Sequence, residues 1–167
     1  MKRKMVFVGV MAGTFCLPLS ASMAQESSPS SGDGQQSVTC EAVTAEEVAD
    51  LFEDWNAALQ TRDPDAVVAL YGPDSVLVPT LSNEIRLTPA AIRDYFVHFL
   101  EDGPEGSIDQ REIRIGCNTA LDIGLYTFAF ADTGDVAHAR YSYTYAFEDG
   151  GWAIASHHSS LMPETTE

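Results

Sequence analysis

Basic residues are scarce in this chain. Lysine and arginine total 9 against 25 aspartates and glutamates, which gives a formal net charge of −16 over 167 residues. Such a chain lacks the basic patch that binds nucleic acid, and an anionic membrane surface would repel it. Long hydrophobic runs are also lacking, since residues 5–19 fall short of the ~20 residues of a membrane span. We therefore expect neither nucleic acid as a partner nor a stable membrane span in the mature protein.

The first 24 residues have the pattern of a secretory signal peptide. Three basic residues precede the apolar run, and the small residues Ser22 and Ala24 offer a cleavage site after Ala24. An uncleaved membrane anchor is the alternative. Cleavage would remove three basic residues and no acidic one, which takes the net charge to −19. The sequence thus predicts a periplasmic or secreted protein.

Cysteines are few as well. Of the three in the chain, one lies in the predicted signal peptide, which leaves Cys40 and Cys117. In an oxidising compartment an even pair most simply forms one disulfide. We expect a bond between Cys40 and Cys117, and a free reactive thiol is the alternative.

Polar residues mark the ends of a single predicted domain. Residues 25–38 are rich in serine, glycine and glutamine without apolar periodicity, which predicts a disordered tether. Residues 39–163 form the predicted domain, and residues 164–167 form a short C-terminal tail. One domain fits a chain of this length.

Three segments have helix signals. Thr44 followed by Glu47 is a capping-box pattern, and apolar residues then recur at helical spacing to about residue 60. Asp63 and Thr88 each precede a proline, which is a typical start of a helix. The sequence therefore predicts one long helix and two shorter ones before residue 103.

The remainder is strand-like. Residues 75–79 and 84–87 are short extended pieces, and four long runs follow between turn signals, over residues 108–116, 120–130, 136–147 and 152–160. Four such strands with short links make an antiparallel meander, and helices that precede it define an α+β class. A curved sheet folded around the first helix would bury its apolar stripe and leave a cavity at the open end.

Several sequence blocks together resemble a known family. They are Leu51-Phe-Glu-Asp-Trp-Asn-Ala-Ala-Leu59, Leu77-Val-Pro-Thr80, Arg93-Asp-Tyr-Phe96, Gly124-Leu-Tyr-Thr-Phe128, Asp149-Gly-Gly-Trp152 and His157-His-Ser-Ser160. From residue 40 to residue 163 the chain resembles the SgcJ/EcaC-type bacterial proteins. These are related to the calcium/calmodulin-dependent protein kinase II association domain within the nuclear-transport-factor-two-like (SnoaL-like) superfamily. The resemblance implies a cone-shaped sheet around helices, with a cavity as its site, that often forms homodimers or larger rings.

Alternation divides the predicted strand over residues 136–147 into two faces. Tyr141, Tyr143, Tyr145 and Phe147 share one face, and Arg140 lies on the other. The aromatic stripe is either core or an assembly surface. For an outer sheet face we favour assembly, because so large an exposed apolar patch is unusual on a monomer.

Two residues are the main candidates for binding a ligand. Arg140 lies in mid-strand among short polar residues, where its guanidinium could clamp a carboxylate; an ordinary cross-strand ion pair is the alternative. His158 shares a predicted face with Ser160, and we place both inward. There His158 could act as an acid or base, with a hydrogen-bonded core histidine as the alternative. His157 then points the other way, so that the two histidines cannot bind one metal ion, and we expect no metal site.

Further candidates come from the predicted helices and from one strand. Trp55 and Tyr95 should line the cavity, although Trp55 is favoured as core and the Tyr95 hydroxyl could bind a buried carbonyl instead. Asp122 is an acid inside an apolar run and is a weak candidate for a catalytic base; a turn or edge-strand aspartate is the favoured alternative.

Enzyme motifs are otherwise missing. The sequence has no glycine-rich dinucleotide loop, nucleophile elbow or metalloprotease motif, so we expect no cofactor. We predict a secreted small-ligand-binding or homo-oligomeric assembly module, in which a cavity with Arg140, His158, Tyr95, Trp55 and Ser160 binds a small carboxylate. The alternative is a cofactor-independent isomerase or cyclase that uses His158 and Arg140.

Overall fold

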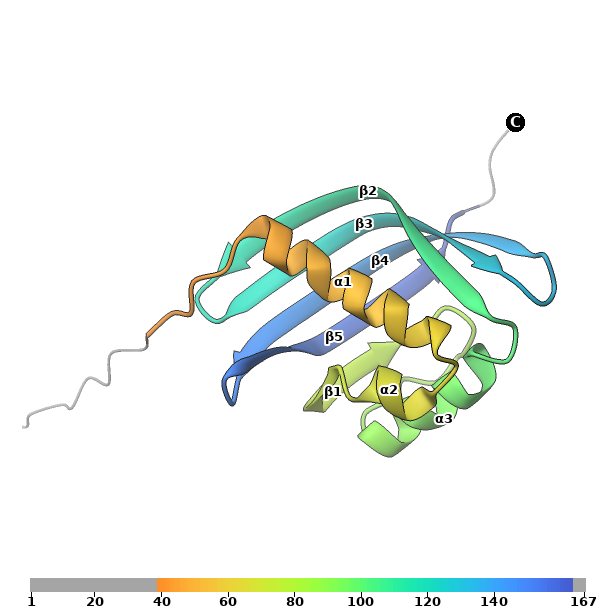
Figure 1. Cartoon of the computed structure of the whole chain (residues 1–167), viewed down its shortest axis with the longest axis horizontal. Coiled ribbons are helices and arrows are strands. Elements are labelled where there is room, and N and C mark those ends of the chain that lie inside the picture. Colours follow the sequence, from red (N-terminus) through yellow and green to blue (C-terminus); the bar gives the residue numbers. More distant parts are fainter. Residues whose placement is uncertain (1–38, 164–167) are drawn as a thin grey trace, which may run out of the picture. The chain divides into compact units, whose positions relative to one another are not determined.

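The computed structural model describes residues 39–163. The predicted signal peptide, tether and C-terminal tail lie outside these residues. The elements, shown in Figure 1, are α1 (Ala45–Gln60), α2 (Pro64–Val68), β1 (Tyr71–Val78), α3 (Pro89–Phe99), β2 (Pro104–Gly116), β3 (Thr119–Phe130), β4 (Val136–Glu148) and β5 (Gly151–Leu161). Helices dominate the first part and strands the second, which confirms the predicted α+β class.

Capping residues begin each helix where the sequence predicts it. The Thr44 hydroxyl accepts a hydrogen bond from the backbone N–H of Glu47, and the Glu47 carboxylate accepts one from the backbone N–H of Thr44. Asp63 and Thr88 cap α2 and α3, each directly before a proline. These side chains satisfy N–H groups that have no partner within the helix. Between residues 39 and 163, no helix is long and apolar enough to cross a membrane.

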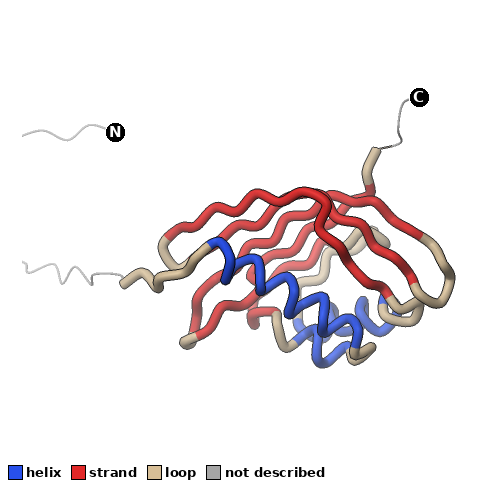
Figure 2. The backbone as a smooth tube through the Cα atoms, turned by 45° about the horizontal axis from the view of Figure 1, so that its top comes forward, coloured by secondary structure: helices blue, strands red, loops and turns tan. Residues whose placement is uncertain are grey.

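One curved sheet packs against the helices. Its strand order is β1-β5-β4-β3-β2, with β1 parallel to β5 and every other neighbouring pair antiparallel. The strands β2 to β5 are the predicted meander, and β1 joins it at one edge. The second predicted short piece, residues 84–87, contributes only an isolated pairing of Arg86 with Leu77. Figure 2 shows the helices on the same, concave side of the strands, which confirms the predicted curved sheet around N-terminal helices.

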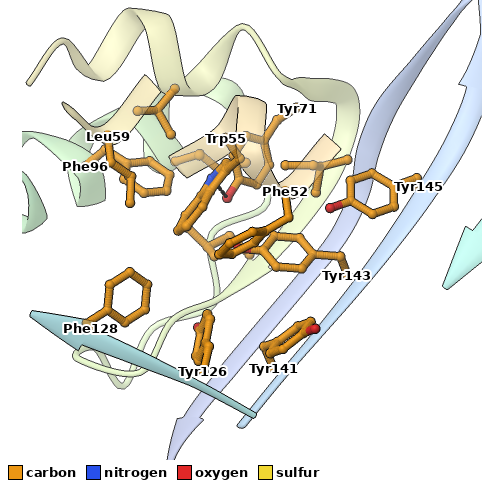
Figure 3. Packing of buried hydrophobic residues seen from close by; sticks show 14 of the residues in the cluster. Phe52, Trp55, Leu59, Tyr71, Phe96, Tyr126, Phe128, Tyr141, Tyr143 and Tyr145 are labelled. Atoms are coloured by element: carbon orange, nitrogen blue, oxygen red, sulfur yellow. Dashed lines mark hydrogen bonds between the residues drawn. The ribbon is translucent and has the colours of Figure 1, made fainter. Parts of the chain in front are cut away.

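The aromatic core lies on this concave side (Figure 3). Phe52 and Trp55 of α1 pack on Tyr143 of β4, with ring centroids 6.1 Å and 5.7 Å apart. Tyr141, Tyr143 and Tyr145 are only 4%, 0% and 1% exposed. The prediction that this stripe is an assembly surface is therefore wrong. It is core, because the apolar face of α1 needs an apolar partner of similar extent.

The segment before α1 is fastened to the turn between β2 and β3. Cys40 and Cys117 form a disulfide, as the sequence predicts. Beside it, the Asn118 side chain accepts a hydrogen bond from the backbone N–H of Glu41 (2.7 Å) and donates one to the carbonyl of Thr39 (3.0 Å). A disulfide is compatible with an extracellular location.

Candidate functional site

A bulge in β5 decides which of its side chains face the core. Between Ile154 and Ser156 the strand has one residue more than β4, so that Ala155 is left without a partner. The alternation of faces shifts by one position there. Ile154 and His157 are 2% and 4% exposed, whereas His158 is exposed on the outer side. The prediction that His158 faces inward is wrong, because strict alternation along β5 does not continue through the bulge.

His157 ends a buried chain of hydrogen bonds. The indole N–H of Trp55 donates to Tyr71 Oη (3.2 Å), and Tyr71 Oη lies 2.9 Å from His157 Nδ1. Since Tyr71 Oη already accepts from the indole, its own proton is free to bond Nδ1, which leaves the ring proton on Nε2. Burial of the imidazole, which stacks on Tyr143 with centroids 4.0 Å apart, lowers the pKa of His157 to about 3. His157 is thus a neutral histidine of the interior, and Trp55 belongs to the same packed core.

A small cavity lies beside this core. Its volume is about 70 Å³, and its lining includes Ser159 and four aromatic rings, those of Tyr95, Phe99, Phe128 and Phe130. An adjoining pocket of about 220 Å³ shares Tyr95, Phe99 and Phe130 with it. The smaller cavity has room for only a few water molecules. Of the predicted ligand-binding residues, Tyr95 is the one that this cavity contains.

The hydroxyl groups of Thr80, Tyr95 and Ser159 form the polar part of the lining of the smaller cavity. Tyr126 donates to Ser159 Oγ, which also contacts Thr80 Oγ1. Burial raises the pKa of Tyr126 above its ordinary range, so the phenol stays protonated. Among the described residues, no charged side chain lines this cavity, so a carboxylate would find no cation there. Sequence reasoning missed Thr80 and Tyr126, because no local pattern shows which loop meets which strand.

Asp122 is neither at a turn nor on an edge strand. It lies on β3 with 0% exposure, accepts a hydrogen bond from Tyr141 Oη (2.8 Å) and pairs with Arg111 Nε (3.2 Å). Burial raises the pKa of Asp122, and the hydrogen bond from Tyr141 and the charge of Arg111 oppose that rise. Arg111 also stacks over the Phe52 ring, 5.4 Å from its centroid. The carboxylate is held by its neighbours as a buried ion pair, which favours a structural role.

Arg140, His158 and Ser160 do come together, but on the outer face of the sheet. Arg140 pairs directly with Ser160, and Ser142 pairs with His158. His138 lies two residues before Arg140 on the same side of β4. We call His138, Arg140, Ser142, His158 and Ser160 the polar patch. Its guanidinium, imidazole and hydroxyl groups are all able to donate hydrogen bonds to an anion.

Arg140 has no acidic partner among residues 39–163. Its guanidinium donates to the carbonyl of Leu161 (3.3 Å) and forms no ion pair within that range. The other five arginines there are paired, as Arg62–Asp132, Arg86–Asp94, Arg93–Asp65, Arg111–Asp122 and Arg114–Glu112. Arg140 thus does not form the cross-strand ion pair that was the alternative interpretation within this range. Its charge remains available to bind an anion.

The residues directly around Arg140 on β3, β4 and β5 include no carboxylate, whereas Glu148 at the end of β4 and Glu105, Asp109 and Glu112 on the neighbouring β2 are exposed acids. We use the term outer face for a set of neighbouring outward-pointing residues on three strands. These are Leu121, Ile123, Leu125 and Thr127 on β3, Val136, His138, Arg140, Ser142, Thr144 and Ala146 on β4, and Ser156, His158 and Ser160 on β5. A groove of about 710 Å³ with largely apolar lining borders one end, where Val136 and Leu161 are 59% and 50% exposed. In a chain with 25 acidic residues, this surface differs from the rest by its apolar and basic side chains.

Solved structures define the class of fold. An NTF2-like protein of unknown function from Pseudomonas putida KT2440 is 18% identical, covers 75% of this chain and 92% of its own, and superposes with a TM-score of 0.65. An NTF2-like superfamily protein from Salmonella enterica is 17% identical, with coverage of 72% and 92% and a TM-score of 0.61. The chain therefore has the nuclear-transport-factor-two-like fold.

A narrower relation defines the family. The pattern of the "Calcium/calmodulin dependent protein kinase II association domain" matches residues 44–163. A solved structure from Xanthomonas campestris, described as a "Putative calcium/calmodulin dependent protein kinase II association domain", is 44% identical over 77% of this chain and 98% of its own, with a TM-score of 0.69. The chain belongs to this association-domain family. Comparison with the curated proteins gives no match, and the resemblance to SgcJ/EcaC-type proteins stays a prediction.

Proposed function

We propose that this protein is an exported self-assembly module whose outer face binds a second copy of the same chain. The observation that carries the proposal is the absence of carboxylates from the outer face of a protein with a net charge of −16. Two copies with this charge repel each other over most approaches. This region is bordered by exposed acids on β2 and at the end of β4, but it contains none itself, so two copies can meet there at a lower electrostatic cost than on the acidic surfaces.

Apolar side chains on the same face support this proposal. Leu121, Ile123 and Leu125 point outward from β3 and are half-buried in the single chain. Val136 and Leu161 are exposed at the neighbouring groove. Burial of such surface contributes roughly 25 cal/mol per Å². The name of the matching family, an association domain, points to the same role.

The concave side offers less support for a ligand or for catalysis. Aromatic side chains fill most of it and leave a cavity of about 70 Å³, whose described lining has no charged group, beside a pocket of about 220 Å³ that Arg86, His98 and Asp102 help to line. Arg140 and His158, the residues of the predicted isomerase or cyclase, lie on the outer face instead. We therefore assign the carboxylate-binding capacity of Arg140 to an interface and not to a substrate cavity.

Light scattering after size exclusion tests the proposal. The protein should elute with at least twice its monomer mass at micromolar concentration. Ile123→Glu places a carboxylate in the middle of the outer face and should give a monomer with unchanged circular dichroism. Ile85→Glu is the matched control, because Ile85 is 58% exposed but lies outside the sheet. A monomeric parent protein would refute self-assembly.

A further inference from the structure

The polar patch contains a positive charge that no carboxylate of residues 39–163 neutralises. Arg140 forms no ion pair in this range, and its guanidinium donates to the carbonyl of Leu161 (3.3 Å). A guanidinium has five N–H donors, so most of those of Arg140 are left to bind an anion. The chain has 25 acidic residues against 9 basic ones, and the other five arginines of the range are each paired with one of these acids.

Three further donors lie close to this guanidinium on β4 and β5. Ser160 is the direct cross-strand partner of Arg140, and Ser142 follows two positions later on the same side of β4. His158 pairs with Ser142 and is therefore a diagonal neighbour of Arg140. Diagonal neighbours are ~7–8 Å apart, which a long side chain can span. The guanidinium fits two oxygens of one carboxylate or phosphate group, and the three side chains add hydrogen-bond donors around it.

An apolar groove adjoins this set of donors. Its volume is about 710 Å³, and Leu125, Val136 and Leu161 are among its lining residues. Leu125 is the partner of Arg140 on β3, and Leu161 supplies the carbonyl to which Arg140 donates. Val136 and Leu161 are 59% and 50% exposed. The groove thus offers an apolar surface to the body of a molecule whose charged head lies on Arg140.

The carboxylate of the groove is already hydrogen-bonded. Asp109 is the acid among the described residues that line it. It accepts a hydrogen bond from Thr127 Oγ1 (2.7 Å), and the same oxygen lies 2.8 Å from His138 Nδ1. Because a hydroxyl has one proton, the bond to Asp109 leaves His138 Nδ1 to donate to Thr127. The groove therefore favours an anionic head at its Arg140 end over a cationic head at Asp109.

We infer that the polar patch and the adjoining groove form a binding site for a small amphipathic oxyanion, a carboxylate or phosphate monoester with an apolar body. The head lies on Arg140 beside Ser160 and His158, and the body lies against Leu125 and Leu161 in the groove. The apolar body adds affinity in proportion to the area that it removes from water. The site shares Arg140 with the face that we assign to self-assembly, but one chain supplies all of its residues.

Isothermal titration calorimetry with short amphipathic probes tests the site. Hexanoate and hexyl phosphate should bind at least about tenfold more tightly than acetate and inorganic phosphate, because their apolar body enters the groove. Arg140→Gln should raise the dissociation constants of both hexyl anions at least about tenfold, as expected for loss of a hydrogen bond to a charged group. Arg93→Gln is the matched control, because Arg93 is an exposed arginine that pairs with Asp65 on the helical side, and it should leave both constants unchanged.

A second variant separates the body of the ligand from its head. Val136→Ser removes apolar surface from the groove and should weaken hexanoate about threefold while leaving acetate unchanged. Equal affinities of the parent protein and Arg140→Gln, or tighter binding of hexylamine than of hexanoate, would overturn the inference. Light scattering on the same samples reports self-assembly separately. A monomeric parent protein that binds the hexyl anions refutes the proposed function alone, and an oligomer that binds neither overturns this inference alone.

Discussion

Replacing the buried imidazole of His157 should make the protein more resistant to acid. The pKa of His157 is lowered to about 3 in the folded chain, mainly by burial, against ~6.5 in an unfolded chain. Between these two values the unfolded state holds one proton that the folded state lacks. The free energy of unfolding is therefore fully present above pH ~6.5 and falls as the pH is lowered toward the folded pKa.

The size of the effect follows from this one proton. Linkage contributes roughly 1.4 kcal/mol per pH unit, so that His157 costs about 2–3 kcal/mol of stability between pH 6.5 and pH 4.5. Phenylalanine keeps the stacking on Tyr143 but cannot be protonated. At neutral pH the variant leaves the Tyr71 hydroxyl proton without its acceptor, a cost of about 1–3 kcal/mol. It also removes the His157 Nε2 atom, which is buried without a hydrogen-bond partner among the described residues.

Urea unfolding at pH 6.5, 5.5 and 4.5, followed by tryptophan fluorescence, measures the free energy of unfolding of each variant and its dependence on pH. His157→Phe should lose about 2–3 kcal/mol less than the parent protein over this range. His98→Gln is the matched control, because His98 has an exposed side chain and should leave the pH dependence unchanged. Parallel pH profiles for the parent protein and His157→Phe would refute the assignment of His157 as a buried neutral histidine.

Two further predictions concern the stability of the fold, one at the disulfide and one at Gly124. Reduction, or the double change Cys40→Ser with Cys117→Ser, should lower the free energy of unfolding by up to ~4.5 kcal/mol, since the disulfide closes a loop between residues 77 positions apart; an unchanged urea midpoint would contradict this. Gly124→Ala should cost several kcal/mol, because the added Cβ would lie 1.8 Å from the Gln110 carbonyl oxygen. Gly151→Ala meets no atom within 4 Å and should change stability by less than ~0.5 kcal/mol, so equal thermal melts for the two alanine variants would count against the close approach of β2 to β3 at Gly124.

Local sequence signals predicted the helices better than they predicted which side chains of a strand face the core. The capping box at Thr44 and the apolar spacing after it gave both ends of α1, because these interactions lie within a few residues. Along β4 the sequence separated the two sets of side chains correctly. It did not show which set is core, since that depends on the aromatic face of α1, far away in the chain.

The candidate site, too, was predicted in part: its residues are neighbours, as expected, but they lie on the other side of the sheet. Arg140, His158 and Ser160 were expected to lie together, and β4–β5 pairing does bring them together. They lie on the outer side of the sheet because Ala155 forms a bulge that shifts the alternation of β5 by one position. No glycine or proline at this position indicates the bulge in the sequence. The ion pair of Arg111 with Asp122 was also missed, because it depends on the register of β2 against β3.

The fastening of the segment before α1 has a mechanical consequence. A force applied to the chain before residue 39 does not reach the first turn of α1 directly. It passes through the bond between Cys40 and Cys117 into the turn between β2 and β3. The Asn118 side chain of this turn also forms hydrogen bonds with the backbone of the same segment. The capped start of α1 is shielded from the pull. The domain can therefore be held by its N-terminal side under tension without unwinding the helix on which its core is packed.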